Sequence, residues 1–232
     1  MAREPTGYPG ASPLDAIAGK GFLRRLTPML IAEMAHAGHE AWYPARTVLI
    51  APSYGPAILV SGALRYFLAD PDGRQVTIRY VGPGGLVGTV IPEESDTRGS
   101  VEVLTDSVLL HLNAKNLWSL TATRPEMAEA LLNESVSRMR AAYRALRSRA
   151  FNTVPERVAR DIIDRTAIAG PLRAGVNVEV TQQALADAVG SVREVVARAL
   201  AQLRREGMIT STRSRITILD PVALRRAAGD VA

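Results

Sequence analysis

Three charged residues stand at the start of a predicted helix in the C-terminal part of the chain. Arg193 and Glu194 follow a Gly-Ser turn, and Arg198 lies about one helical turn further on. A guanidinium group can donate two hydrogen bonds to the O6 and N7 acceptors of guanine, and a carboxylate can accept one from the N4 amino group of cytosine. Residues of these types at the start of a helix indicate a surface that reads the edges of base pairs.

The surrounding sequence places these charges on the second of two short helices. Residues 181–209, TQQALADAVGSVREVVARALAQLRREGMI, contain two helical patterns separated by Gly190 and Ser191. Glycine permits a tight turn between helices, and the small Ala186 leaves room where the first helix passes close to the second. A rotation of about 100° per residue separates the charged side of the second helix from an apolar side, which consists of Val195, Val196, Ala199, Leu200 and Leu203.

An ordinary surface helix is the alternative interpretation of the same residues. Ser191 is predicted to be the N-cap of the second helix on either interpretation. In the alternative, Ser191 also forms a capping box with Glu194, and Glu194 pairs with Arg198 one turn later. This alternative leaves Arg193 unexplained, together with the helix before it and the arginine-bearing hairpin after it. A DNA-binding face explains them all, because the elements around a recognition helix commonly bind phosphates. The predicted DNA contacts are Arg193, Glu194, Arg198, Thr181, Gln182, Ser191, Arg213 and Arg215.

The N-terminal half of the sequence is typical of a small β domain. Between Tyr43 and Asn113, short β-type runs alternate with turns that contain glycine, proline and aspartate. Runs of this kind at intervals of about 8–12 residues predict an antiparallel β-roll. Residues 22–41 predict short helices before the roll. The first twenty residues contain several prolines and glycines and predict a flexible arm.

A long helix is predicted to follow the β-roll. It begins near Pro125 and ends near Phe151, and its apolar positions are spaced 4, 3, 4, 3, 4, namely Leu132, Val136, Met139, Tyr143, Leu146 and Ala150. This heptad-type seam predicts that the helix pairs with its copy in a homodimer. The same pattern also fits a helix that docks on its own β domain.

The last part of the chain predicts a winged helix. Thr153 and Pro155 suit the start of a helix over residues 155–168. A short strand, NVEV, then precedes the two helices described above, and two β-type runs, ITS and RITIL, follow them. The predicted organisation is an arm (1–20), a β-roll (21–113), a dimerisation helix (114–151) and a winged helix-turn-helix domain (152–232).

Composition narrows the classes of function. The 232-residue chain has a formal net charge of +5 and no cysteine, so disulfides, iron–sulfur clusters and thiolate zinc sites are excluded. Its three histidines are scattered, with His36 and His39 on a predicted helix and His111 on a predicted strand. They predict neither a metal or haem site nor a cupin-like oxygenase. The sequence contains no nucleophile–base set, P-loop or dinucleotide fingerprint, so we expect no enzyme.

The distribution of charge is also informative. Between Arg193 and Arg226, eight arginines face three acidic residues, which favours an anionic partner for this end of the chain. The N-terminal residues lack the apolar core of a signal peptide, and no window resembles a membrane span. We expect a cytoplasmic protein that does not bind membranes.

At residues 181–200 the pattern T-Q-x-x-L-A-x-x-V-G-x-x-R-E-x-V-x-R-x-L resembles the cyclic-AMP receptor protein/FNR family of bacterial transcription regulators. The resemblance extends over roughly residues 22–226. It implies an α+β fold: an N-terminal antiparallel β-roll like the cyclic-nucleotide-binding jelly roll, a long dimerisation helix and a C-terminal winged helix-turn-helix. It also implies a homodimer that reads a palindromic TGTGA-type site on double-stranded DNA, with RNA polymerase as a partner. Val192 departs from the small polar residue common at its position.

The effector pocket departs further from the family pattern. Members that bind cyclic nucleotides hold the ribose and the cyclic phosphate with a Gly-Glu pair followed by an Arg-Ser pair. The corresponding candidates here are Gly88, Thr89, Arg98 and Ser100, with Gly99 between the last two. Because Thr89 cannot supply the ribose-binding carboxylate, we do not expect cyclic AMP to be the natural effector. No cofactor is identified by the sequence, and a small-molecule effector of unknown identity stays open.

Three alternatives to this interpretation remain at the level of the sequence. The first is a regulator of the same fold that needs no effector. The second is a regulator that responds to a cyclic nucleotide through a degenerate pocket. The third is a nucleotide-sensing module whose winged helix binds a protein, which the arginine-rich face of the second helix disfavours.

Overall fold

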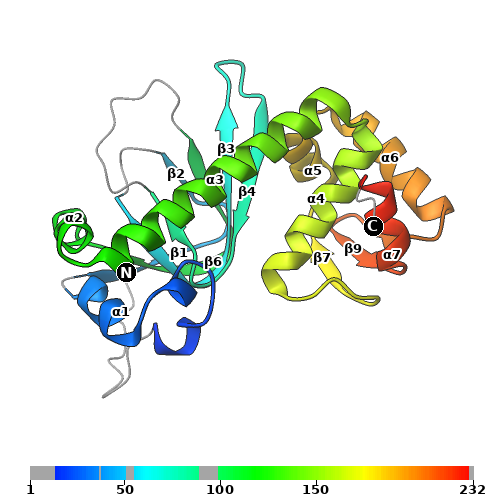
Figure 1. Ribbon diagram of the computed structural model, residues 1–232. Coiled ribbons are helices and arrows are strands. Elements are labelled where there is room, and N and C mark those ends of the chain that lie inside the picture. Colours follow the sequence, from blue (N-terminus) through cyan, green and yellow to red (C-terminus); the bar gives the residue numbers. More distant parts are fainter. Residues whose placement is uncertain (1–13, 37, 51–54, 89–98, 230–232) are drawn as a thin grey trace.

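The computed structural model describes residues 14–36, 38–50, 55–88 and 99–229. Figure 1 shows a β domain and a mostly helical C-terminal domain, with the long helix α3 (Pro125–Phe151) running between them. The predicted α+β fold is confirmed. None of the described helices is long and apolar enough to cross a membrane.

The β domain is one antiparallel sheet that curves around its own core. Its six strands are β1 (His39–Tyr43), β2 (Val48–Ile50), β3 (Ala57–Ala69), β4 (Gln75–Val81), β5 (Leu86–Val87) and β6 (Ser100–His111). The order β1-β6-β3-β4 forms the main path, while β2 pairs with β6 and β5 pairs with β3. Alternate residues of β3 and β6 point inward and are fully buried, among them Leu59, Leu64, Val101, Val103 and Leu109.

Short helical elements cover one part of this sheet. They are η1 (Asp15–Ile17), η2 (Leu23–Arg25), α1 (Pro28–Ala35) and α2 (Ala114–Thr123). Their apolar residues share a core with Ile58 and Leu110 of the sheet and with the first turns of α3. Thr27 begins α1 by accepting a hydrogen bond from the backbone N–H of Leu30.

Three predictions for this half of the chain need correction. The flexible arm is wrong for residues 14–20, since Leu14 is fully buried; residues 1–13 lie outside the described part. The predicted helices of residues 22–41 end at Ala35, and residues 39–41 belong to β1 because they pair with β6. The predicted dimerisation helix, 114–151, is two helices, of which α2 packs in the core of the β domain.

Helix α3 begins at Pro125 and ends at Phe151, as its apolar pattern predicts, and its two faces differ. Met127, Ala130, Glu134 and Ala141 are buried on one face, so α3 does dock on its own domain. The large members of the heptad seam point elsewhere, and the exposed fractions of Leu132, Met139, Tyr143 and Leu146 lie between 51% and 66%. The seam is therefore uncovered in the single chain.

The C-terminal domain is a winged helix-turn-helix, as predicted. Its elements are α4 (Val154–Ala169), β7 (Asn177–Glu179), α5 (Gln182–Val189), α6 (Arg193–Arg205), β8 (Ile209–Ser211), β9 (Arg215–Ile218) and α7 (Pro221–Ala227). The three strands form a small sheet in the order β7-β9-β8. Thr153 and Glu156 begin α4, because the backbone N–H of Thr153 donates to the Glu156 carboxylate at 2.6 Å. This hydrogen bond lowers the pKa of Glu156.

Candidate nucleic-acid interface

Helix α6 separates a buried face from a charged one. Val196, Ala199, Leu200 and Leu203 are buried against α4, α5 and the small sheet. Arg193, Glu194 and Arg198 are exposed. Within the described chain, these three side chains form no hydrogen bond or ion pair. The predicted amphipathic arrangement is confirmed, and the charged groups are available to a partner.

The turn before α6 requires a glycine. Gly190 has φ +59° and ψ +53°, a left-handed conformation that is costly for other residues. Arg149, near the end of α3, donates to the carbonyl oxygens of Val189 and Gly190 at 3.0 and 3.1 Å. The backbone N–H of Ser191 donates to Ala186, which is fully buried where the two helices meet. The turn is thus fixed from both α3 and α5.

The predicted capping of α6 is wrong. Val192 is the N-cap, with extended backbone at φ −103° and ψ 153°, and no side chain of the described residues caps this end of the helix. Ser191 lies one residue too early for this role, so the capping box with Glu194 does not form. Nor do Glu194 and Arg198 form an ion pair in the part of the chain that the structure describes. The N-terminus of α6 consequently keeps unpaired N–H groups beside the charged side chains.

The flanking candidates lie on α5 and on the small sheet. Thr181 caps α5, accepting from the backbone N–H of Ala184 at 3.1 Å, and the partly buried Gln182 follows it. Arg213 is exposed in the turn between β8 and β9. By contrast, Arg215 pairs with Glu179 of β7 at 2.6 Å, so its charge is already balanced.

Two further residues support this interface and were not among the predicted contacts. Arg204, at the end of α6, donates to the Ser211 hydroxyl of β8 at 3.1 Å and ties the helix to the small sheet. Arg149 supports the turn as described above. The contacts of both residues depend on how separate elements pack, and no local sequence pattern predicts them.

The described part of the effector-type pocket contains a partly buried charge cluster. Gly88 has φ +75°, and a Cβ there would lie 2.3 Å from the Gly55 carbonyl oxygen, so only glycine fits. Arg138 of α3 donates to the carbonyl oxygens of Gly88 and Leu86 at 2.8 and 2.9 Å. The Arg138 guanidinium also pairs with Glu134, its neighbour one turn earlier, at 3.0 Å.

Glu134 is the centre of this cluster. Besides Arg138, it pairs with Arg79 of β4 at 3.0 Å and with Arg25 of η2 at 3.3 Å. Burial, and then the charge of Arg138, lower the pKa of Arg79 to about 10, while Glu134 opposes that shift. The Arg79 guanidinium remains charged at neutral pH, so three cations surround one carboxylate.

Among the other predicted pocket residues, the described Ser100 does not join this cluster. Gly88 follows β5, which pairs with the first residues of β3, whereas Ser100 opens β6 opposite Phe67, near the other end of β3. Strand pairing therefore does not bring Gly88 and Ser100 together. Thr89 and Arg98 lie outside the described residues.

Two of the three histidines, His39 and His111, form a small polar cluster with Tyr43. The rings of His39 on β1 and His111 on β6 stack with centroids 5.1 Å apart, which corrects the predicted helical position of His39. The Tyr43 hydroxyl lies 2.8 Å from Nε2 of His111. Burial, followed by the charge of His39, lowers the pKa of His111. Among the described residues, no group of three or more side chains could hold a metal ion.

Comparison with known proteins agrees with both domains. A model of the cyclic nucleotide-binding domain matches residues 42–124, and a model of the Crp-like helix-turn-helix domain matches residues 156–227. The transcriptional regulator LdrP of Thermus thermophilus is 32% identical over 183 residues, which cover 74% of this chain and 86% of LdrP.

Two further relatives match this chain over nearly all or all of their own length. The CRP-like cAMP-activated global transcriptional regulator of Mycobacterium tuberculosis is 27% identical over 221 residues, 92% of this chain and 99% of that protein. The crystal structure of a CRP/FNR-family transcriptional regulator from Thermus thermophilus has a TM-score of 0.69 at 26% identity, and the match covers 84% of this chain and all of that one. All three relatives are transcriptional regulators and not enzymes. The chain belongs to the CRP/FNR family of transcriptional regulators, which bind DNA through a Crp-type helix-turn-helix.

Proposed function

We propose that this regulator is a homodimer that reads a palindromic TGTGA-type site with α6. The observation that carries the proposal is the free, exposed set of Arg193, Glu194 and Arg198 on one face of α6. The two arginines suit guanine, and Glu194 suits the amino group of cytosine. These are the bases of the G·C pairs in such a half-site.

The neighbouring groups suit phosphates. Arg213 extends from the small sheet, and the uncapped N-terminus of α6 offers N–H groups to an anion. Thr181 and Gln182 stand at the start of α5. Because Arg215 already pairs with Glu179, we assign it a weaker contact than Arg213.

The dimer rests on the exposed seam of α3. A two-fold axis along α3 would bury Leu132, Met139, Tyr143 and Leu146 against their copies and would repeat α6 across two half-sites. A two-fold dimer matches a palindrome because each recognition helix then meets the same sequence. RNA polymerase as a further partner rests on the family alone.

For the effector, we propose that cyclic AMP is not the natural ligand. Arg138 and Glu134 occupy the surroundings of Gly88, and Thr89 replaces the family's glutamate. The mycobacterial relative is named as cAMP-activated, so its name identifies the ligand to test. Isothermal titration calorimetry with cyclic AMP and cyclic GMP tests this proposal. We expect no binding at micromolar concentrations, and micromolar affinity for either nucleotide would refute the proposal about the effector.

DNA reading is tested by fluorescence anisotropy with a TGTGA palindrome and a scrambled duplex. Arg193→Ala should weaken binding to the palindrome by about 1–3 kcal/mol and relax selectivity at one base pair. Arg173→Ala is the matched control, since Arg173 is an exposed arginine of the same domain outside α5, α6 and the small sheet. If the wild type and Arg193→Ala bind both duplexes equally, α6 does not read bases.

A further inference from the structure

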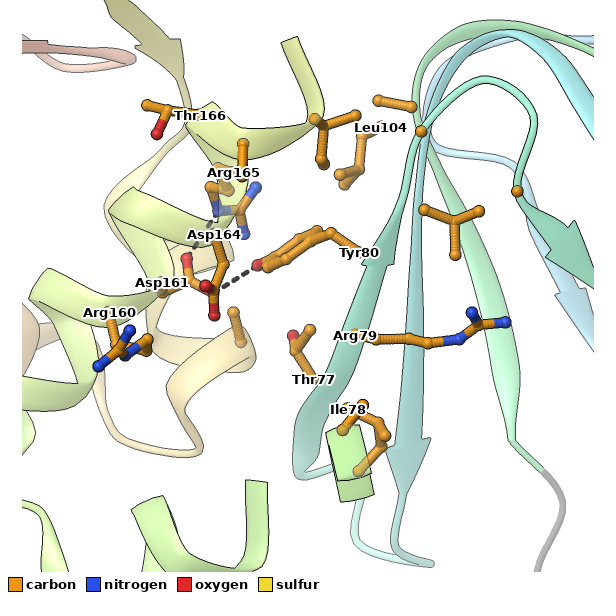
Figure 2. Close-up of a pocket in the computed structure, with 18 of the residues that line it drawn as sticks. Thr77, Ile78, Arg79, Tyr80, Leu104, Arg160, Asp161, Asp164, Arg165 and Thr166 are labelled. Atoms are coloured by element: carbon orange, nitrogen blue, oxygen red, sulfur yellow. Dashed lines mark hydrogen bonds and ion pairs between the residues drawn. The ribbon is translucent and has the colours of Figure 1, made fainter. Parts of the chain in front are cut away.

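The two domains meet where strand β4 faces helix α4 (Figure 2). The Tyr80 hydroxyl of β4 donates to one carboxylate oxygen of Asp161 on α4. The other oxygen of Asp161 accepts from Nε of Arg165 at 2.7 Å. The guanidinium carbon of Arg165 also lies 5.0 Å from the centre of the Tyr80 ring. One tyrosine of the β-roll thus contacts both members of an ion pair in the DNA-binding domain.

This contact is shielded from water. The side chains of Asp161 and Arg165 are 6% and 7% exposed. Burial, and then the negative charge of Asp161, raise the pKa of Tyr80 well above its ordinary value, so the hydroxyl keeps its proton at neutral pH. A hydrogen bond to a charged acceptor is stronger than one between neutral groups, and more so away from solvent.

Helices α4 and α6 share one hydrophobic core, so a movement of α4 also moves α6. Val158 and Ile162 of α4 are fully buried in the same core as Leu200 and Leu203 of α6, so the domain moves as one body. Between α3 and α4, the backbone leaves helical geometry at Asn152 and Thr153. Such a joint permits a change of angle, and contacts between the domains must therefore define their orientation.

Strand β4 also reaches the charge cluster of the roll. Successive strand residues point to opposite faces, and Figure 2 shows Arg79 pointing away from Tyr80. Arg79 donates to the Leu86 carbonyl and pairs with Glu134 of α3, while Tyr80 bonds α4. Two adjacent residues of one strand thus connect the surroundings of Gly88 with the DNA-binding domain.

We propose that Tyr80 is a positioning residue for DNA recognition: by bonding Asp161, it holds the DNA-binding domain in an orientation that is ready to bind DNA. In this orientation α6 keeps its charged residues exposed, and the β-roll does not cover them. The proposal rests on DNA binding through α6. Tyr80 itself belongs to the other domain and acts only through Asp161.

The test compares Tyr80→Phe with Tyr43→Phe. Tyr80→Phe removes the hydroxyl and leaves the Asp161–Arg165 pair intact, so the fold should survive. Tyr43→Phe removes a hydroxyl whose hydrogen bond, to His111, stays within the β-roll. The chain has no cysteine, so spin labels can be attached at Asp72→Cys in the β-roll and Val222→Cys on α7. Mixing with excess unlabelled chain confines the measured distances to one chain.

Loss of a hydrogen bond to a charged group should shift the orientational equilibrium about tenfold. Pulsed electron paramagnetic resonance should then show a broader distance distribution for Tyr80→Phe and an unchanged one for Tyr43→Phe. DNA affinity should fall by about two- to tenfold for Tyr80→Phe only, since it tracks the population of the binding-ready orientation.

An unchanged distance distribution in Tyr80→Phe would overturn the proposal. So would an altered distribution with unchanged DNA affinity, or equal effects of the two tyrosine variants. If the wild type binds no DNA duplex at all, the proposed function fails, whereas the distance measurement still reports on the contact itself.

Discussion

The seam of α3 offers a direct test of the dimer through Leu146→Ala. Leu146 is 65% exposed in the single chain and belongs to the heptad spacing. Alanine is a better helix former than leucine, so the substitution should preserve α3. It removes apolar surface that only a partner could bury, and it leaves the buried face of α3 untouched.

The size of the effect follows from the exposed surface. Full burial of a leucine side chain contributes about 1.5–3 kcal/mol, so burying the exposed 65% of Leu146 contributes about 1–2 kcal/mol. Each dimer contains two copies, which gives about 2–4 kcal/mol and a dissociation constant about 30- to 700-fold higher.

Sedimentation velocity over a range of concentrations measures this constant. Leu219→Ala is the matched control, because Leu219 is 46% exposed but lies in the DNA-binding domain. Its dissociation constant should equal that of the wild type. Equal constants for Leu146→Ala and the wild type would refute the seam, as would a wild type that is monomeric at micromolar concentration.

Two further predictions concern stability, both measured by urea unfolding. Gly190→Ala should destabilise the chain more than Gly207→Ala. Both glycines have positive φ, where alanine costs about 1–2 kcal/mol, but only at Gly190 would a Cβ also meet the Arg149 guanidinium. Equal losses of stability in the two variants would contradict this role of Arg149. Because the pKa of His111 is lowered on folding, the unfolded chain binds the proton more readily, and stability should fall as the pH drops from about 7.5 to 5.5. His111→Gln should flatten this dependence, and an unchanged slope would rule out His111 as its source.

The parts of the fold that the sequence predicted are those set by local periodicity. The bounds of α3 and the two faces of α6 follow from apolar spacing, and the turn at Gly190 follows from a residue type that alone tolerates its backbone. Each of these signals lies within a few turns of one element. The winged helix was predicted for the same reason.

The wrong or missing predictions concern features that tertiary contacts and backbone angles determine. The sequence HEAWY lacks a clear strand pattern, yet it pairs along its whole length with β6. The N-cap of α6 depends on the backbone angles of Val192, which a list of good capping residues does not reveal. The Tyr80–Asp161 contact joins residues 81 positions apart, and neither neighbourhood has a motif.

The charged residues of α6 differ from other charged residues of this protein, several of which form ion pairs. Glu134 of α3 pairs with Arg79 of β4, Asp161 pairs with Arg165 one turn later on α4, and Glu179 of β7 pairs with Arg215 of β9. On α6, Arg193, Glu194 and Arg198 have no such pair in the described structure, although Glu194 and Arg198 have the spacing for one. An exposed pair contributes only about 0–1 kcal/mol, so stability does not demand it. A pair formed in the free protein would have to break before either group met a base. Leaving these charges unpaired costs the fold little and, under the proposal that α6 reads bases, favours the complex with DNA.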